Sequence, residues 1–180
     1  MTKQPDDNRD IEEAIKFLVL AIMSSGRNPK PVIVHSIRVG MHLDKLGFEK
    51  SVVTAALLHD VIEDTAVEIE DVKQKFGETV AQLVAANSFD ETIDDKTERY
   101  KETYTRCYRA GKQALIIKTA DIYDNSDYYH FASSKEEAKW LLGKMKYFIE
   151  KAGNILKDEV IYQALVDKYE RVKNNIALLS

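Results

Sequence analysis

The chain has 180 residues, a formal net charge of −4 and a single cysteine, Cys107. This length fits one domain, 1–180, in which residues 1–9 form a flexible lead-in. The acidic balance disfavours a nucleic acid as partner, the lone thiol excludes an internal disulfide and suits a reducing cytoplasm, and no run approaches the ~18 consecutive apolar residues of a membrane span. The sequence does not indicate an oligomeric state.

Helical spacing of apolar residues dominates the sequence, whereas the alternation typical of strands is rare. All three prolines lie within the first 31 residues, so the rest of the chain lacks this helix breaker. These patterns predict an all-α fold.

The first half of the chain alternates apolar helical stretches with short polar breaks. Its predicted elements are, in order, helix 10–24 with a buried stripe of Ile11, Ile15, Leu18 and Ile22, a basic loop over 24–31, helix 34–46, a helix that Ser51 caps, helix 68–76 and helix 78–86. The helix capped by Ser51 ends in two polar residues, His59 and Asp60.

The second half continues in the same way after a polar, acidic loop. Its predicted elements are the loop 87–96, helix 97–110, helix 112–127, a long helix that Ser134 caps, and helix 157–174, in which Val160 is expected to be buried. The spacing of Tyr100, Tyr104, Cys107 and Tyr108 favours a core or interface stripe over a surface that stacks on a base.

Four ionisable residues stand at the end of the most apolar stretch of the first half. His59 and Asp60 follow the run Ala55–Leu58, and Glu63 and Asp64 come one helical turn later. Buried charge is costly unless it is paired or bound to a metal. The run therefore indicates a metal site, the alternative being a helix end whose acids are only solvated.

Two further segments place polar residues among apolar neighbours. His35 lies between Val34 and Ile37, and Asp121 interrupts a run that otherwise reads as buried. With His59 and Asp60 they give two imidazoles and two carboxylates, a set that suits a first-row divalent ion with open positions for water or substrate. Mn²⁺, Fe²⁺ and Zn²⁺ all fit this set.

The order His35, His59-Asp60, Asp121 resembles the H…HD…D pattern of the HD-domain metal-dependent phosphohydrolases. This resemblance implies an HD-domain helical bundle of about eight to ten helices. It also implies that these four residues hold one Mn²⁺, with another divalent metal as the alternative.

A narrower resemblance covers residues 26–125. The stretch 56–65, ALLHDVIEDT, resembles the LLHDVVEDT stretch of the RelA/SpoT-type hydrolase domain, and residues 118–121 with Asn125 resemble its KLAD…N stretch. The total length is close to that of the stand-alone small alarmone hydrolases. The implied activity is metal-dependent removal of the 3′-pyrophosphate of (p)ppGpp, giving GDP or GTP and pyrophosphate.

The resemblance also implies roles for residues outside the metal set. Glu63 and Asp64 would position and deprotonate the attacking water, and Asn125 would contact the nucleotide. Lys118 matches the family's lysine, which makes it a candidate for substrate binding. The remaining candidate contacts to the small-molecule nucleotide are Arg27 and Lys30, which border His35, and the hydroxyl of Ser88.

The sequence departs from the family at positions that are expected to contact the nucleotide. Val32 stands where an aromatic residue often packs on the base, Ser36 replaces a proline, and Asp127-Tyr128 replace an Arg-Thr pair. A carboxylate beside a polyanionic ligand repels it at short range. Two alternatives therefore stay open: an HD-type nucleotidase acting on another nucleotide, and a non-catalytic HD module that binds one.

Overall fold

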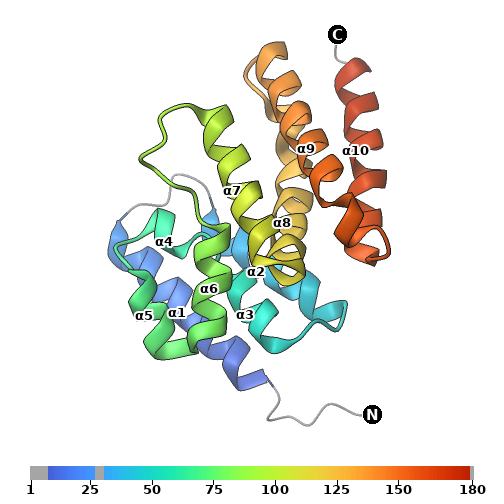
Figure 1. Ribbon diagram of the computed structural model, residues 1–180. Helices are drawn as coiled ribbons and strands as arrows, with labels where there is room; N and C mark the ends of the chain where they lie inside the picture. The colour runs from blue at the N-terminus through green and yellow to red at the C-terminus, as the bar shows by residue number, and fades with distance from the viewer. Residues whose placement is uncertain (1–7, 27–30, 179–180) are drawn as a thin grey trace. The chain divides into compact units, whose positions relative to one another are not determined.

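The computed structural model describes residues 8–26 and 31–178, with side chains described as far as residue 176 (Figure 1). All regular elements in these ranges are helices, which confirms the predicted all-α class. The chain divides into two compact units, Met1–Ser88 and Phe89–Ser180, and each is described by itself. Among the described helices, none combines the length and the apolar character that a membrane span requires. The single domain over 1–180 stays a prediction.

The first unit is built around one short helix, which is apolar except for Lys50, Ser51 and Thr54. Its elements are α1 (Arg9–Ser25), α2 (Val32–Lys45), α3 (Lys50–Leu58), α4 (Val61–Asp64), α5 (Ile69–Phe76) and α6 (Glu78–Asn87). Helix α3 packs against α1, α2 and α6. Every residue from Val52 to Leu58 is buried, because a helix that is apolar on all sides needs neighbours on all sides.

A glycine lets α2 approach α3 closely. A Cβ added at Gly40 would lie 2.5 Å from Cγ and 2.6 Å from Cδ2 of Leu57, a side chain with no exposed surface. Interiors at crystal-like density cannot absorb such an overlap without a shift of one helix. Gly40 therefore sets the distance between the helix that carries His35 and the helix that ends before His59.

The second unit surrounds another buried helix. Its elements are α7 (Lys96–Ala110), α8 (Lys112–Asn125), the 3-10 helix η2 (Ser126–Phe131), α9 (Lys135–Leu156) and α10 (Val160–Leu178). Helix α8 contacts α7, α9, α10 and η2. All residues from Ala114 to Ile122 are buried, including Lys118 and Asp121.

The tyrosine stripe of α7 lies in the core of the second unit, as its spacing predicts. Tyr100, Tyr104 and Cys107 are buried, whereas Tyr108 is 38% exposed. The ring of Tyr104 packs edge-on against Phe148 of α9, with centroids 5.0 Å apart. Burial raises the pKa of Cys107 to about 11, so the thiol is protonated at neutral pH and is not a nucleophile.

Most helix ends lie within two residues of the prediction, but the helix predicted over 157–174 runs from Val160 to Leu178. Ser134 caps α9 by accepting a hydrogen bond from Glu137 N. Ser51 does not cap α3, because the cap position is Glu49, two residues earlier. Val160 is 65% exposed, contrary to the prediction, because the first turn of α10 buries Ile161 and Tyr162 and leaves Val160 on its outer side. The stripe of α1 uses Ala14 in place of the half-buried Ile15.

Helix α8 also ends earlier than predicted, at Asn125 instead of Asp127. The chain continues there as the 3-10 helix η2.

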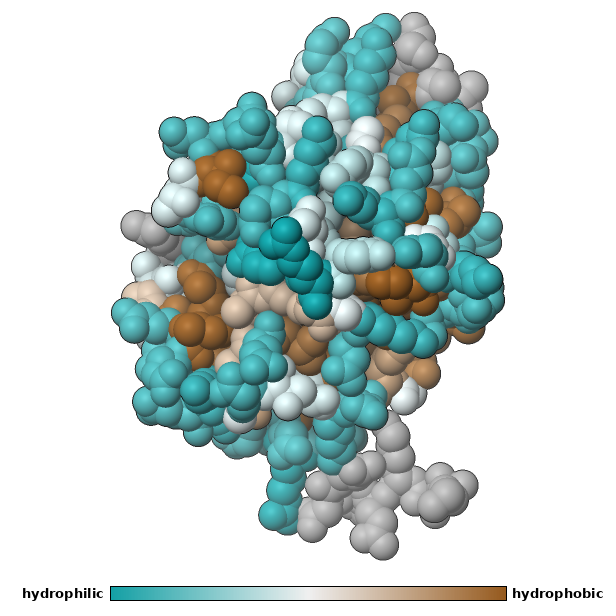
Figure 2. Space-filling view, in the orientation of Figure 1, coloured by the Kyte–Doolittle hydropathy of each residue, from teal (hydrophilic) through white to brown (hydrophobic). Residues whose placement is uncertain are grey.

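On the face drawn in Figure 2, hydrophilic side chains cover most of the surface and apolar ones form separate patches. This pattern is usual for surfaces in contact with water.

The contact at Gly40 predicts a loss of stability on adding one methyl group. We expect Gly40→Ala to lower the free energy of unfolding by about 1–3 kcal/mol, because the new Cβ overpacks the α2–α3 contact. Gly143→Ala in α9 is the matched control: nothing lies within 4 Å of its added Cβ, so it should raise stability by about 0.5–1 kcal/mol. Urea unfolding followed by circular dichroism measures both, and equal effects of the two changes would contradict the close-approach argument.

Candidate metal centre

Two histidines of the first unit face each other in its interior. His35 lies in the first turn of α2 and His59 follows the last residue of α3. Their Nε2 atoms are 3.3 Å apart, and the rings meet at 66° with centroids 5.2 Å apart. His35 is 6% exposed and His59 is fully buried. Both imidazoles therefore direct the same ring nitrogen to one buried point.

A backbone carbonyl fixes the tautomer of His59. Its Nδ1 lies 2.7 Å from the carbonyl oxygen of Ala56. A carbonyl only accepts hydrogen bonds, so Nδ1 must carry a proton. In the neutral imidazole the lone pair is then on Nε2, which is how proteins orient histidines that bind metals. Sequence reasoning missed Ala56, although its place in the last turn of α3 leaves its carbonyl outside the regular pattern of helix bonds.

Asp60 adds a carboxylate to the two imidazoles. Its Oδ1 lies 3.2 Å from Nε2 of His59, and its Oδ2 lies 3.7 Å from Nε2 of His35. The Nε2 lone pair of neutral His59 thus faces a carboxylate oxygen, and only a proton or a cation between two acceptors makes this arrangement favourable. With Asp60 8% exposed, the nitrogen and oxygen donors form a partial ligand set for a first-row divalent ion.

The two acids predicted to handle water lie directly after this cluster. Helix α3 and helix α4 are separated by a break at His59 and Asp60, so the stretch is not one continuous helix. The turn is nevertheless helical, because Asp64 N donates to Asp60 O at 3.0 Å. Glu63 and Asp64 are half-buried on α4. Their role in proton transfer stays a prediction.

Three other residues of the first unit have positions that bear on the predicted nucleotide contacts. The hydroxyl of Ser88 donates to Val84 O at 3.0 Å and lies 3.4 Å from His59 O, so it supports the backbone of the cluster. Val32 and Ser36 have no exposed surface. A valine buried in this way does not offer a face to a base.

In the second unit, Asp121 is held by two neighbours on the same helix. Its Oδ2 lies 3.0 Å from Nζ of Lys118, and its Oδ1 accepts a hydrogen bond of 2.5 Å from Nδ2 of Asn125. Spacings of three and four residues place all three side chains on one face of α8. Lys118 is 2% exposed and Asp121 8%. Two residues predicted to bind substrate therefore both position the carboxylate of Asp121.

The remaining predicted residues fall outside these two clusters. Arg27 and Lys30 lie outside the described residues. Asp127 and Tyr128 lie in η2 and are exposed, and Asp127 Oδ1 pairs with Nζ of Lys168 at 2.8 Å. The carboxylate that replaces the family's arginine is therefore partly neutralised.

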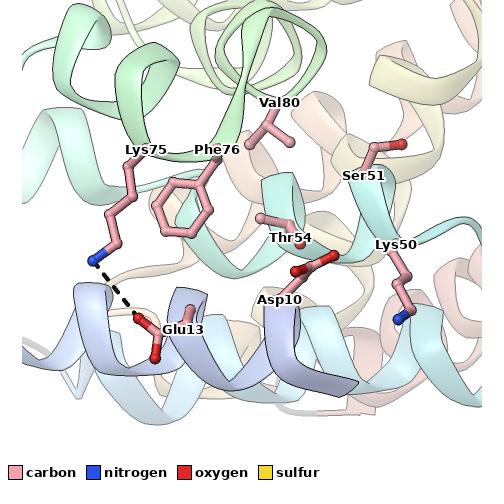
Figure 3. A pocket seen from close by; sticks show the side chains of 8 residues that line it. All are labelled: Asp10, Glu13, Lys50, Ser51, Thr54, Lys75, Phe76 and Val80. Carbon is pink, nitrogen blue, oxygen red and sulfur yellow. Dashed lines mark ion pairs between the residues drawn. The ribbon is translucent and has the colours of Figure 1, made fainter. Parts of the chain in front are cut away.

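A cavity of about 450 Å³ in the first unit is separate from the predicted chemistry. Figure 3 shows side chains of α1, α3, α5 and α6 around it, among them Asp10, Thr54 and Phe76. None of the predicted site residues lines it.

The sequence of the chain matches one protein family. Residues 14–121 match the family described as HD domain. This match contains His35, His59, Asp60 and Asp121, the four residues of the predicted ligand set.

Several curated relatives of the chain carry the same enzyme name. A protein of Aquifex aeolicus named guanosine-3′,5′-bis(diphosphate) 3′-pyrophosphohydrolase is 29% identical over 97% of this chain and 27% of its own length. The proteins of the same name, MESH1, are 35% identical in Drosophila melanogaster and 36% in Danio rerio, over 53% and 51% of this chain and 54% and 51% of their own lengths. The chain thus matches about a quarter of the first relative and about half of the other two.

Two solved structures share the fold. One is described as a metazoan ortholog of SpoT that hydrolyzes ppGpp; it is 22% identical, with a TM-score of 0.79 over 94% of this chain and 98% of its own. The other, lmo0812 of Listeria monocytogenes EGD-e, is 27% identical, with a TM-score of 0.63 over 79% of this chain and 97% of its own. The first likeness shows the fold and no more.

The hydrogen bond to Ala56 predicts one tautomer of His59. In the protein loaded with Zn²⁺, a diamagnetic substitute, we expect proton–nitrogen correlation spectra of the imidazoles to show His59 protonated at Nδ1 only. The exposed His130 provides the reference signal in the same spectrum. Protonation of His59 at Nε2 in the loaded protein would contradict its assignment as a metal ligand.

Proposed function

Because this chain belongs to the HD-domain family, we propose that it is a metal-dependent phosphohydrolase that removes the 3′-pyrophosphate of a (p)ppGpp-like nucleotide. The observation that carries the proposal is the buried convergence of His35, His59 and Asp60, with His59 in the tautomer that binds a metal. The names of the relatives at 29–36% identity support the choice of substrate.

The proposed cofactor is one Mn²⁺ held by His35, His59, Asp60 and Asp121. HD-domain membership and the donor set support a divalent ion, and the choice of manganese rests on the family resemblance. When bound, such an ion supplies Lewis acidity to the phosphoryl group and to water. Lys118 and Asn125 support the role of Asp121 by holding both of its oxygens.

The proposed reaction adds water to the phosphorus attached to the nucleotide's 3′ oxygen and breaks the bond between them. Glu63 and Asp64 orient the water and accept its proton, and the 3′ oxygen leaves with a proton as a hydroxyl. The products are pyrophosphate and GDP or GTP. General-base help of this kind contributes about 10²–10⁴-fold to a rate.

The proposed nucleotide contacts are residues that already bind other protein groups or that were selected from the sequence alone. Asn125, Lys118 and Ser88 each have a protein partner, so a contact with substrate would add to these bonds or replace them. Arg27 and Lys30 are proposed phosphate contacts on the basis of sequence alone. A small-molecule substrate and a cytoplasmic location suit the net charge of −4 and the single cysteine.

A second candidate function is hydrolysis of another phosphorylated nucleotide. The buried Val32 and the replacement of Arg-Thr by Asp127-Tyr128 favour it, because both changes fall where the family binds its substrate. The position of the phosphate that leaves distinguishes the two candidates.

A product-resolved assay tests the activity. With Mn²⁺, the purified chain should convert ppGpp into GDP and pyrophosphate, a chelator should abolish turnover, and added Mn²⁺ should restore it. His59→Ala and Asp60→Ala should each lower kcat/KM by at least about 100-fold, since even the loss of groups that only support metal ligands costs 10–100-fold. Ion chromatography of the products over a panel of 3′- and 5′-phosphorylated nucleotides provides the measurement.

Release of orthophosphate from nucleoside monophosphates, with ppGpp left intact, would establish the nucleotidase instead. A folded protein that binds no divalent ion and turns over no nucleotide of the panel would show a non-catalytic module.

The acids of α4 should affect the chemical step and not metal binding. We expect Glu63→Gln and Asp64→Asn to lower kcat by about 10²–10⁴-fold while Mn²⁺ affinity, measured by electron paramagnetic resonance, changes less than threefold. Glu70→Gln on the exposed face of α5 is the matched control and should leave kcat unchanged. Loss of Mn²⁺ affinity in the Glu63 or Asp64 variants would make these residues ligands instead.

A further inference from the structure

A buried lysine of the last helix contacts the end of α8. Lys168 of α10 is 7% exposed. Its Nζ donates to the carbonyl oxygen of Tyr123 at 2.8 Å, pairs with Oδ1 of Asp127 at 2.8 Å, and lies 3.7 Å from the centroid of the Tyr123 ring. These three contacts occupy the ammonium group of a residue that lies 45 positions away from Tyr123 in the chain.

The contacts stabilise the end of α8, where the hydroxyl of Ser126 also donates to Tyr123 O at 2.8 Å. The last carbonyls of a helix lack intrahelical partners and carry a partial negative charge, which a cation stabilises. Lys168 supplies that cation from another helix. Its bond to Asp127 lies beyond the end of α8, in η2, so one ammonium group joins the last turn of α8 to the segment that follows.

The same turn carries Asn125, which binds Asp121 and is a proposed nucleotide contact. Tyr123 lies between Asp121 and Asn125, whose side chains are hydrogen-bonded to each other. Asp127 follows Asn125 by two residues and its side chain is 62% exposed. Without a cation beside it, this carboxylate would repel a polyanionic nucleotide at short range.

We propose that Lys168 is a positioning residue that fixes the end of α8 and neutralises Asp127, so that the segment around Asn125 tolerates a polyphosphorylated nucleotide. The proposal rests on the proposed function for its substrate. It adds that a residue of α10, Lys168, increases the affinity for the charged nucleotide. Lys168 contacts the turn and not the reacting atoms.

Steady-state kinetics on ppGpp with Mn²⁺ test the proposal. Lys168→Met should raise KM about five- to tenfold with kcat within twofold of the unchanged chain, and the increase should shrink at higher ionic strength because Asp127 is solvent-exposed. Asp127→Asn in the Lys168→Met background should reverse part of the KM increase, because it removes the uncompensated carboxylate but leaves the last turn of α8 without its cation. Lys168→Arg, which keeps the cation, should leave KM within about threefold of the unchanged chain.

The matched control is Lys173→Met, which removes an exposed lysine of α10 that pairs with Glu170 on the surface. It should leave KM unchanged. A KM for Lys168→Met equal to that of the control, or no restoration by Asp127→Asn, would overturn the proposal.

Hydrogen exchange separates this proposal from the proposed function. The amides of residues 126 and 127 should exchange at least about tenfold faster in Lys168→Met than in Lys173→Met, whatever nucleotide the protein hydrolyses. If Lys168→Met does not fold, the double variant Lys168→Met/Asp127→Asn, which leaves no uncompensated carboxylate, should show the same faster exchange. An exchange rate in Lys168→Met equal to that in Lys173→Met would overturn the proposal. If the chain without substitutions does not hydrolyse ppGpp but exchange is faster in Lys168→Met, only the proposed substrate would be overturned.

Discussion

The hydrogen bond between Nδ1 of His59 and the carbonyl of Ala56, 2.7 Å long, determines what the first cluster can do. Without it, the proton of a neutral imidazole could occupy Nε2 and close the ring nitrogen that faces His35 and Asp60. With it, the lone pair is directed to the buried point where the two other donors meet. The carbonyl is part of the backbone, so the tautomer is set by the helix end itself.

The apolar character of α3 brings His59 into the interior, where its polar atoms need partners. Seven consecutive buried residues bring His59 into the core, where an uncompensated donor or charge would be costly. Gly40 then allows α2 to approach until His35 reaches the same point. In the second unit, a run of buried residues in α8 likewise carries Asp121 inward, where Lys118 balances its charge and, together with Asn125, fixes its oxygens. The two units thus each bury proposed ligand groups on or directly after helices with long buried runs.

Sequence patterns predicted much of this, because helical spacing and local side-chain chemistry act over three or four residues. The buried run before His59, the cap at Ser134 and the spacing of Lys118, Asp121 and Asn125 are all of this kind. The spacing did not reveal that Lys118 and Asn125 turn toward Asp121, since it gives a shared face and not a direction.

What sequence could not predict depends on residues far apart in the chain. Lys168 binds the carbonyl of Tyr123 in the last turn of α8, and the spacing of residues near Asn125 does not predict that contact. The close approach at Gly40 depends on Leu57 in another helix. Similarly, Val160 is apolar but exposed, because the first turn of α10 packs through Ile161 and Tyr162 instead.

The proposed metal site requires His35, His59, Asp60 and Asp121 to bind one divalent ion together. Anomalous diffraction from crystals grown with Mn²⁺ locates manganese without reference to activity. We expect one strong manganese peak per chain, within about 2.0–2.4 Å of a donor atom from each of the four residues. A peak bound by other residues, or none at all in protein shown to contain the ion, would contradict it.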